Sequence, residues 1–174
     1  ISESARFAKS RYIEEKGIAF YNLAEQRDLE GIVAKRKDSL YYFDKRTKDW
    51  IKCKNLKDED FVVCGYISKD NHMISLVLGQ YENGSLVCRG HVTLGVGGEH
   101  FRRIKAIPVR HAPPFAVPSG NENAVWIAPV LVCTVKYMEK TEHGGMRQPV
   151  FKGLRNDKTP EECMTNGEVV AFVK

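Results

Sequence analysis

The chain has 174 residues, of which 43% are hydrophobic and 28% are charged, and its formal net charge is +5. This length suits one mid-sized domain or two small units, and the composition excludes wholesale disorder. No apolar run approaches the roughly 20 residues that cross a bilayer, and the first residues lack the layout of a signal peptide. We therefore expect a cytoplasmic protein with no membrane partner.

The positive charge is concentrated in residues 34–57. A basic stretch favours anionic partners, but many basic proteins bind no nucleic acid, so charge alone decides little. Tyr41 and Tyr42 follow the first basic run, where they could stack on nucleic acid or fill a contact between two units. The basic candidates for nucleic-acid contacts in this stretch are Arg36, Lys37, Arg46 and Lys48.

Cysteine and histidine spacing gives no metal signature. The five cysteines lie more than four residues apart, which excludes the paired spacing of a zinc knuckle or finger. An odd number of cysteines without a secretory signal indicates reduced thiols, and most of them have the apolar neighbours of a small core residue. The five histidines are scattered.

The first third of the chain predicts a helix and two strands. Residues 18–28 have apolar side chains at helical spacing. Short apolar runs at 31–36 and 49–55 predict strands, separated by a polar segment. The sequence LKDED at 56–60 has no strong period, so it predicts a charged joint between two units.

The remainder predicts short strands and one helix. Residues 61–68 form a strand with a glycine, which indicates a bulge or bend. Asn83-Gly84 marks the turn of a hairpin within 73–95. A short helix is expected at 97–107, a proline-rich loop at 109–123, and a long strand pair or one bent strand at 124–141. This pattern predicts a mainly β chain that ends in a small closed barrel of the oligonucleotide-binding (OB) type, with an immunoglobulin-like sandwich as the second choice.

The two early strands carry charges beside apolar residues. On a strand, alternate side chains share a face, so Trp50, Lys52 and Lys54 project to one side. They could line a pocket for a phosphorylated planar ligand. Glu30 opens the first of these strands, where it could hold a divalent cation that phosphate oxygens also ligate. A lysine-rich edge strand that guards against aggregation explains the same spacing equally well.

Three segments together resemble a known enzyme family. EGIVAKRKDS, RTKDWIKCKN and RQPVFKGLRNDK, in this order, are similar to motifs IV, V and VI of the ATP-dependent DNA ligases, most of all the ligase domain of bacterial ligase D. The resemblance covers essentially the whole chain. It implies that residues 1–56 are the C-terminal part of an adenylation (nucleotidyltransferase) domain, α+β in class, and that residues 57–174 are an OB-fold domain.

The resemblance also implies a reaction and its participants. ATP adenylates a lysine of the enzyme, AMP passes to a 5′-phosphate in DNA, and a 3′-hydroxyl displaces AMP to seal a nick or break in repair. The implied cofactors are ATP with Mg²⁺ or Mn²⁺, and the substrate is nicked duplex DNA in the bacterial cytoplasm or nucleoid. We expect a monomer, and the sequence leaves open whether a Ku-like end-binding protein recruits it.

Residue roles follow from the same resemblance. Glu30 matches the motif IV acid that helps to hold the metal, and Lys35 matches the basic end of that motif. Lys52 and Lys54 match the motif V lysines that contact the α-phosphate. Arg155, Asp157 and Lys158 match motif VI. In the family, the OB domain brings this motif over the site, where it orients the pyrophosphate leaving group.

Departures from the family limit what this chain does by itself. The family's nucleophile lies in a Lys-x-Asp-Gly motif, and this tetrapeptide does not occur here. The motifs that bind adenine and ribose are missing too, and the chain does not begin with Met. We therefore expect a C-terminal portion that does not form the lysyl-AMP intermediate alone. A non-catalytic nucleic-acid-binding OB module, or a related RNA ligase or capping nucleotidyltransferase, are the alternatives.

Overall fold

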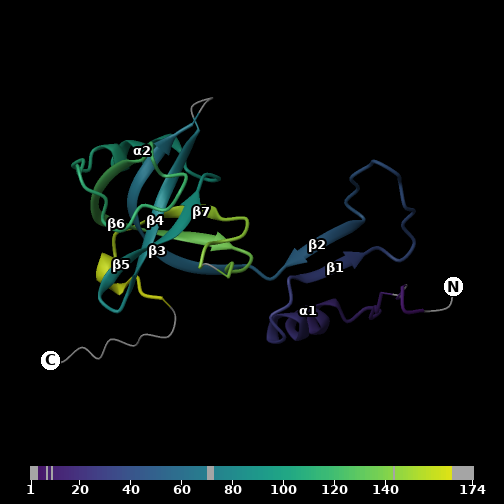
Figure 1. Ribbon diagram of the computed structural model, residues 1–174. Helices are drawn as coiled ribbons and strands as arrows, with labels where there is room; N and C mark the ends of the chain where they lie inside the picture. The colour runs from purple at the N-terminus through teal and green to yellow at the C-terminus, as the bar shows by residue number, and fades with distance from the viewer. Residues whose placement is uncertain (1–3, 7, 9, 70–72, 143, 166–174) are drawn as a thin grey trace. The chain divides into compact units, whose positions relative to one another are not determined.

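The computed structural model describes residues 4–6, 8, 10–69, 73–142 and 144–165. The chain divides into two compact units, Ile1–Asn55 and Leu56–Lys174, each of which is described by itself (Figure 1). Within the described ranges, no helix has the length and apolar character that a bilayer crossing requires.

The first unit consists of one helix and a two-stranded antiparallel sheet. Helix α1 spans Gly17–Gln26, and strands β1 (Gly31–Lys35) and β2 (Trp50–Lys54) pair along their whole length. The helix buries Ala24, and the hydroxyl of Tyr21 donates a 3.2 Å hydrogen bond to the main-chain oxygen of Lys54. These contacts tie the helix to the sheet.

Gly31 is the point at which the chain enters this sheet. Its φ is +133°, and a Cβ added there would lie 2.1 Å from the main-chain oxygen of Cys53. An L-residue rarely adopts this φ, and the neighbouring backbone cannot move aside without breaking the pairing. The glycine of the EGIVAK segment is therefore required by the strand pairing itself.

Replacing this glycine should disrupt the sheet of the first unit. In Gly31→Ala the new methyl group meets the β2 backbone, and we expect a loss of about 2 kcal/mol or more in the local free energy of opening. Amide hydrogen exchange at Ile32 and Cys53 measures this loss. Gly17→Ala is the matched control, because an added Cβ there meets nothing within 4 Å; unchanged exchange in Gly31→Ala would contradict the requirement.

The second unit is a five-stranded antiparallel sheet with a short helix. The strands occur in the spatial order β5-β4-β3-β6-β7 and are strongly twisted (Figure 1). Their bounds, with those of helix α2 and the 3₁₀ turn η2, are Lys57–Ser68 (β3), Ile74–Glu82 (β4), Ser85–Val92 (β5), Gly98–Lys105 (α2), Val125–Tyr137 (β6), Val150–Arg155 (β7) and Pro160–Glu162 (η2).

Several predicted elements are confirmed. The β4–β5 hairpin turns at Asn83 and Gly84, with φ values of 49° and 74°, as the Asn-Gly pair indicated. The pairing of β3 shifts register next to Gly65, where a bulge was expected. The segment that could have been two strands or one is the single long strand β6.

The central strand β3 is buried on both faces. Phe61 and Val63 belong to the main core, which helix α2 covers with Ile104. Val62 and Cys64 belong to a second cluster on the other face. A strand with apolar neighbours on both sides carries a continuous apolar run, which explains the sequence FVVC.

The prediction of a closed barrel is only partly met. The fold is mainly β with antiparallel sheets, as expected, but the described residues form an open ladder with β5 and β7 at its edges. An isolated parallel bridge joins Leu94 to Val150. The chain then turns at Gly95, whose φ is +88° and where a Cβ would lie 2.4 Å from the Phe151 oxygen, so this turn requires glycine.

The charged segment LKDED begins at the division between the two units, which falls between Asn55 and Leu56, but it is not an irregular joint, because β3 begins at Lys57. The segment joins the strand because its three acidic side chains each have a partner in the second unit. Asp58 lies 3.8 Å from the ammonium of Lys136. Glu59 and Asp60 are held by further hydrogen bonds, and those of Asp60 form part of the candidate site below.

Candidate functional site

The two strands of the first unit present their lysines on one face. Pairing places Lys35 opposite Trp50 and Lys54 opposite Gly31, and directly opposed residues of an antiparallel pair project to the same side. Lys35 and Lys52 are exposed, and Lys54 is half-buried. The strand alternation predicted the common face of Lys52 and Lys54, and the register adds Lys35 to it.

Trp50 is engaged with protein groups rather than held open. The ammonium of Lys35 lies 3.9 Å from the centroid of the indole ring, a cation–π contact. The indole N–H donates a 2.9 Å hydrogen bond to the hydroxyl of Ser39, and the ring of Tyr41 lies 5.5 Å away between centroids. Trp50 therefore anchors the segment between β1 and β2.

Glu30 lies at the end of this sheet where β1 begins. Its main-chain oxygen accepts a 2.9 Å hydrogen bond from the amide of Asn55, the residue after β2. Because the neighbouring Gly31 pairs with Lys54, Glu30 and Lys54 lie at the same end of the sheet. The main chain of Glu30 thus lies next to the Lys54 end of the sheet, and Lys35 lies at the other end, opposite Trp50.

The protein side chains around Glu30 could hold a metal ion only if a bound ligand supplied most of the metal's coordination shell. Among the residues that the structure describes, no group of three or more His, Cys, Asp or Glu side chains could hold a metal ion. Glu30 would be one protein ligand. Mg²⁺ accepts such an arrangement when substrate phosphates and water complete its octahedron.

The predicted nucleic-acid contacts lie on the exposed surface of the first unit. Arg36 forms ion pairs with Asp38 at 3.1 Å and Asp49 at 3.5 Å, and Lys37 pairs with Glu14 at 3.1 Å. All these pairs are largely exposed, so their contribution to stability is small. The other two predicted nucleic-acid contacts, Arg46 and Lys48, are also exposed and lie in the segment before β2.

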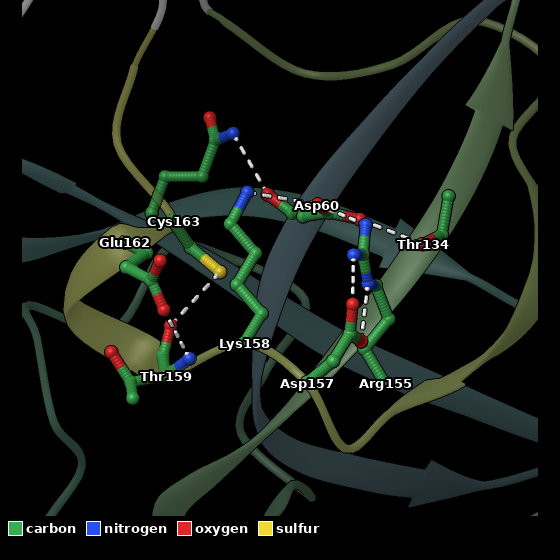
Figure 2. A network of polar contacts seen from close by, with 9 residues as sticks. Asp60, Thr134, Arg155, Asp157, Lys158, Thr159, Glu162 and Cys163 are labelled. Atoms are coloured by element: carbon green, nitrogen blue, oxygen red, sulfur yellow. Dashed lines mark hydrogen bonds and ion pairs between the residues drawn. The ribbon is translucent and has the colours of Figure 1, made fainter.

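In the second unit, the predicted motif VI residues gather around an aspartate that the sequence reading did not single out (Figure 2). Asp60 Oδ2 accepts hydrogen bonds from Arg155 Nη1 at 3.0 Å and from Lys158 Nζ at 2.9 Å. Asp60 Oδ1 accepts a 2.6 Å bond from the hydroxyl of Thr134. These four residues and Asp157 are called the Asp60 cluster below.

The sheet register explains why these residues meet. Asp60 of β3 is directly opposite Thr134 of β6, and Arg155 of β7 is opposite Val132 of β6. Their side chains therefore share a face, the one whose apolar part is the second core cluster with Val62. The Asp60 cluster is the polar continuation of that apolar face.

The electrostatics of the cluster keep its carboxylates charged. Burial opposes the charge on Asp60, but the hydrogen bond from Thr134 and the charges of Lys158 and Arg155 outweigh it and lower its pKa. Asp157 binds Arg155 through two hydrogen bonds, to Nε and Nη2, and this contact lowers the pKa of Asp157 to about 2. Both carboxylates, those of Asp60 and Asp157, are thus ionised at neutral pH.

The segment after Lys158 is fixed by a capping box. The main-chain N–H of Thr159 donates a 2.7 Å hydrogen bond to a carboxylate oxygen of Glu162, and the Thr159 side chain accepts a bond from the same turn in return. Cys163, which follows, is buried in the second core cluster. This turn therefore attaches the end of the motif to the core.

The chain matches known proteins in both sequence and structure. The family model described as ATP dependent DNA ligase C terminal region matches residues 69–158. Multifunctional non-homologous end joining protein LigD of Pseudomonas aeruginosa is 35% identical over 146 residues, which are 77% of this chain and 17% of that protein. The SPbeta prophage-derived DNA ligase-like protein LigB of Bacillus subtilis is 34% identical over 139 residues, 80% of this chain and 46% of that protein.

Solved structures agree with these relatives. The ligase domain of Mycobacterium tuberculosis LigD superposes with a TM-score of 0.59 and 28% identity, covering 83% of this chain and 50% of that domain. Mycobacterial DNA ligase D complexed with ATP and MES gives a TM-score of 0.55 at the same identity, over 83% of this chain and 49% of that one. This chain therefore spans half or less of the relatives it matches. It belongs to the ATP-dependent DNA ligase C-terminal region family and is homologous to the ligase domain of bacterial LigD.

Proposed function

We propose that this chain is the C-terminal portion of an ATP-dependent DNA ligase that seals nicks or breaks during DNA repair. The observation that carries the proposal is the common face of Lys35, Lys52 and Lys54 on a strand pair that Glu30 directly precedes, in a chain of this family. A relative named for non-homologous end joining supports a repair role. Residues 1–56 would complete an adenylation domain, and residues 57–174 would form the OB domain.

The lysines of β2 act on the nucleotide. In the first step, a lysine Nζ from an upstream segment attacks the α-phosphorus of ATP, the bond to the β-phosphate oxygen breaks, and pyrophosphate leaves. Negative charge spreads over the α-phosphate oxygens in this step, and the ammonium groups of Lys52 and Lys54 stabilise it. The same contacts serve when AMP passes to the 5′-phosphate and when the 3′-hydroxyl displaces it.

Glu30 and Lys35 assist at the edge of this face. Glu30 would supply one oxygen to a divalent cation, which supplies charge neutralisation of the phosphates when bound. Lys35 adds a third positive charge to the face. Its contact with Trp50 limits the positions that its ammonium can adopt.

The motif VI residues orient the leaving group. Arg155 and Lys158 carry the donors for pyrophosphate, and Asp157 fixes the guanidinium from the side of Nε and Nη2. A planar guanidinium with fixed donors matches phosphate geometry, and an ammonium adds a point charge. These contacts serve only the first step, since pyrophosphate is absent from the other two.

DNA would contact the exposed basic segment of the first unit. Phosphates attract lysine and arginine independently of sequence, which suits an enzyme that joins any ends. A Ku-like end-binding protein is a partner that this proposal allows but does not require, and we propose that the protein is a monomer. The DNA contacts proposed in this segment are Arg36, Lys37, Arg46 and Lys48.

Adenylation and sealing assays test this function. The 174-residue chain, incubated with Mg²⁺ and ATP labelled at the α-phosphate, should incorporate no label, because it lacks the Lys-x-Asp-Gly lysine. The chain extended by its upstream coding sequence should take up label and seal a nicked DNA duplex. Binding of DNA without labelling of either form would favour the non-catalytic module, and sealing of RNA ends alone would favour an RNA ligase.

A further inference from the structure

Two cations of the Asp60 cluster share one carboxylate oxygen. Arg155 Nη1 and Lys158 Nζ lie 3.0 and 2.9 Å from Asp60 Oδ2. Figure 2 shows both side chains pointing toward Asp60. Two like charges held at one atom repel each other, so without the carboxylate these long side chains would separate. Asp60 therefore determines how close the two cationic groups are.

Asp60 is the rigid member of this group. Its side chain is 12% exposed, whereas those of Arg155 and Lys158 are 37% and 27% exposed. The hydroxyl of Thr134 holds its second oxygen at 2.6 Å, and the amide of Gln80 donates a 3.1 Å bond to its main-chain oxygen. A carboxylate held by residues of two neighbouring strands can position the two more exposed cations.

Both cations retain donors for a ligand. A guanidinium has five N–H donors and an ammonium has three. The described hydrogen bonds of Arg155 use three, two on Asp157 and one on Asp60, and that of Lys158 uses one. The remaining donors belong to groups that Asp60 holds side by side, and a diphosphate offers acceptor oxygens on two adjacent phosphorus atoms.

We propose that Asp60 is a positioning residue, which sets the spacing of Arg155 and Lys158 so that their remaining donors converge on a diphosphate. This inference depends on the proposed function for the identity of the ligand, pyrophosphate. It assigns a role to a carboxylate in a site that otherwise binds anions. Asp60 acts through the two cations and does not itself contact the ligand.

The charge balance of the cluster means that the direction of the change in anion affinity, when Asp60 is removed, tests the proposal. Two cations and the carboxylates of Asp60 and Asp157 sum to zero net charge. If Asp60 only competed with the ligand, removing its charge would tighten anion binding. If Asp60 positions the cations, removing it weakens binding even though the net charge becomes more positive.

The test is a titration of the 174-residue chain with inorganic pyrophosphate, free of metal, followed by NMR signals of the Arg155 Nε–H and the Lys158 ammonium. We expect Asp60→Asn to weaken binding about fivefold or more, and Thr134→Val, which leaves the charge unchanged, to weaken it about two- to threefold. Asp58→Asn is the matched control. It makes the same charge change on the same strand, where Asp58 lies 3.8 Å from Lys136, and should bind within about twofold of the parent chain.

Equal or tighter binding by Asp60→Asn would overturn the proposal. If the parent chain does not bind pyrophosphate, the proposed leaving-group role fails, and the positioning is read from the unliganded spectra. Positioning by Asp60 is supported if rotation of the Arg155 guanidinium is restricted in the parent chain and in Asp58→Asn but free in Asp60→Asn and Thr134→Val. It is contradicted if rotation is the same in the parent chain and all three variants. Backbone amide signals of β3 and β6 verify that each variant folds. If Asp60→Asn does not fold, the result for Thr134→Val decides whether the proposal stands.

Discussion

Reversing the charge of Lys52 or Lys54 is expected to abolish transfer of AMP to the complete ligase, meaning this chain together with the segment that carries the nucleophilic lysine. A glutamate in either position would place a carboxylate against the α-phosphate, where negative charge develops in the transition state. Removing a single donor at such a centre commonly costs about 10²–10³-fold. For the reversed charge we expect a loss of about 10³-fold or more in the rate of labelling by α-labelled ATP.

Lys45→Glu provides the control for this experiment. Lys45 is exposed, lies outside β1 and β2, and contacts the ring of Tyr42 at 5.8 Å from its centroid. Its reversal changes the net charge equally but leaves the lysine face intact, so labelling should stay within about threefold. Normal labelling of both Lys52→Glu and Lys54→Glu would contradict the assignment of this face to the α-phosphate.

Truncation of the motif VI cations should separate the steps of the reaction. In Arg155→Ala or Lys158→Ala of the complete ligase, the rate of the first step should fall by about 10²-fold, because pyrophosphate loses a donor as it leaves. Sealing of DNA that is already adenylated involves no pyrophosphate and should remain within about threefold. The two rates are measured with labelled ATP and with synthetic adenylated nicked DNA.

Lys152→Ala is the matched variant for this pair. Lys152 is an exposed lysine of β7, the strand that ends at Arg155. Its loss therefore removes the same charge from a position near both cations. Both of its rates should match those of the parent enzyme. Equal loss of both steps in Arg155→Ala and Lys158→Ala would show that these residues do more than orient the leaving group.

Local patterns were sufficient to predict much of the fold. The Asn83-Gly84 pair specifies its turn because both residues adopt positive φ at low cost. The apolar run of β3 indicates a buried strand. The alternation of Lys52 and Lys54 is likewise a property of one strand. Each of these features depends on residues close together in the chain.

Features that depend on pairing between distant segments were not predicted. The presence of Lys35 on the lysine face depends on the register between β1 and β2, which one strand does not reveal. Asp60 was assigned to a charged joint because its partners Thr134 and Lys158 lie far along the chain. The open edges of the sheet depend in the same way on where Leu94 meets β7.

The acidic start of β3 also has a consequence for alignment during folding. Glu59 and Asp60 are neighbours that project to opposite sides. Glu59 meets Tyr137 at 2.7 Å and Lys140 at 2.9 Å, whereas Asp60 meets a hydroxyl and two cations of its own side. If this strand shifted by one position, the two carboxylates would exchange sides and each would lose its partners, so these ionic contacts discriminate against mispaired sheets.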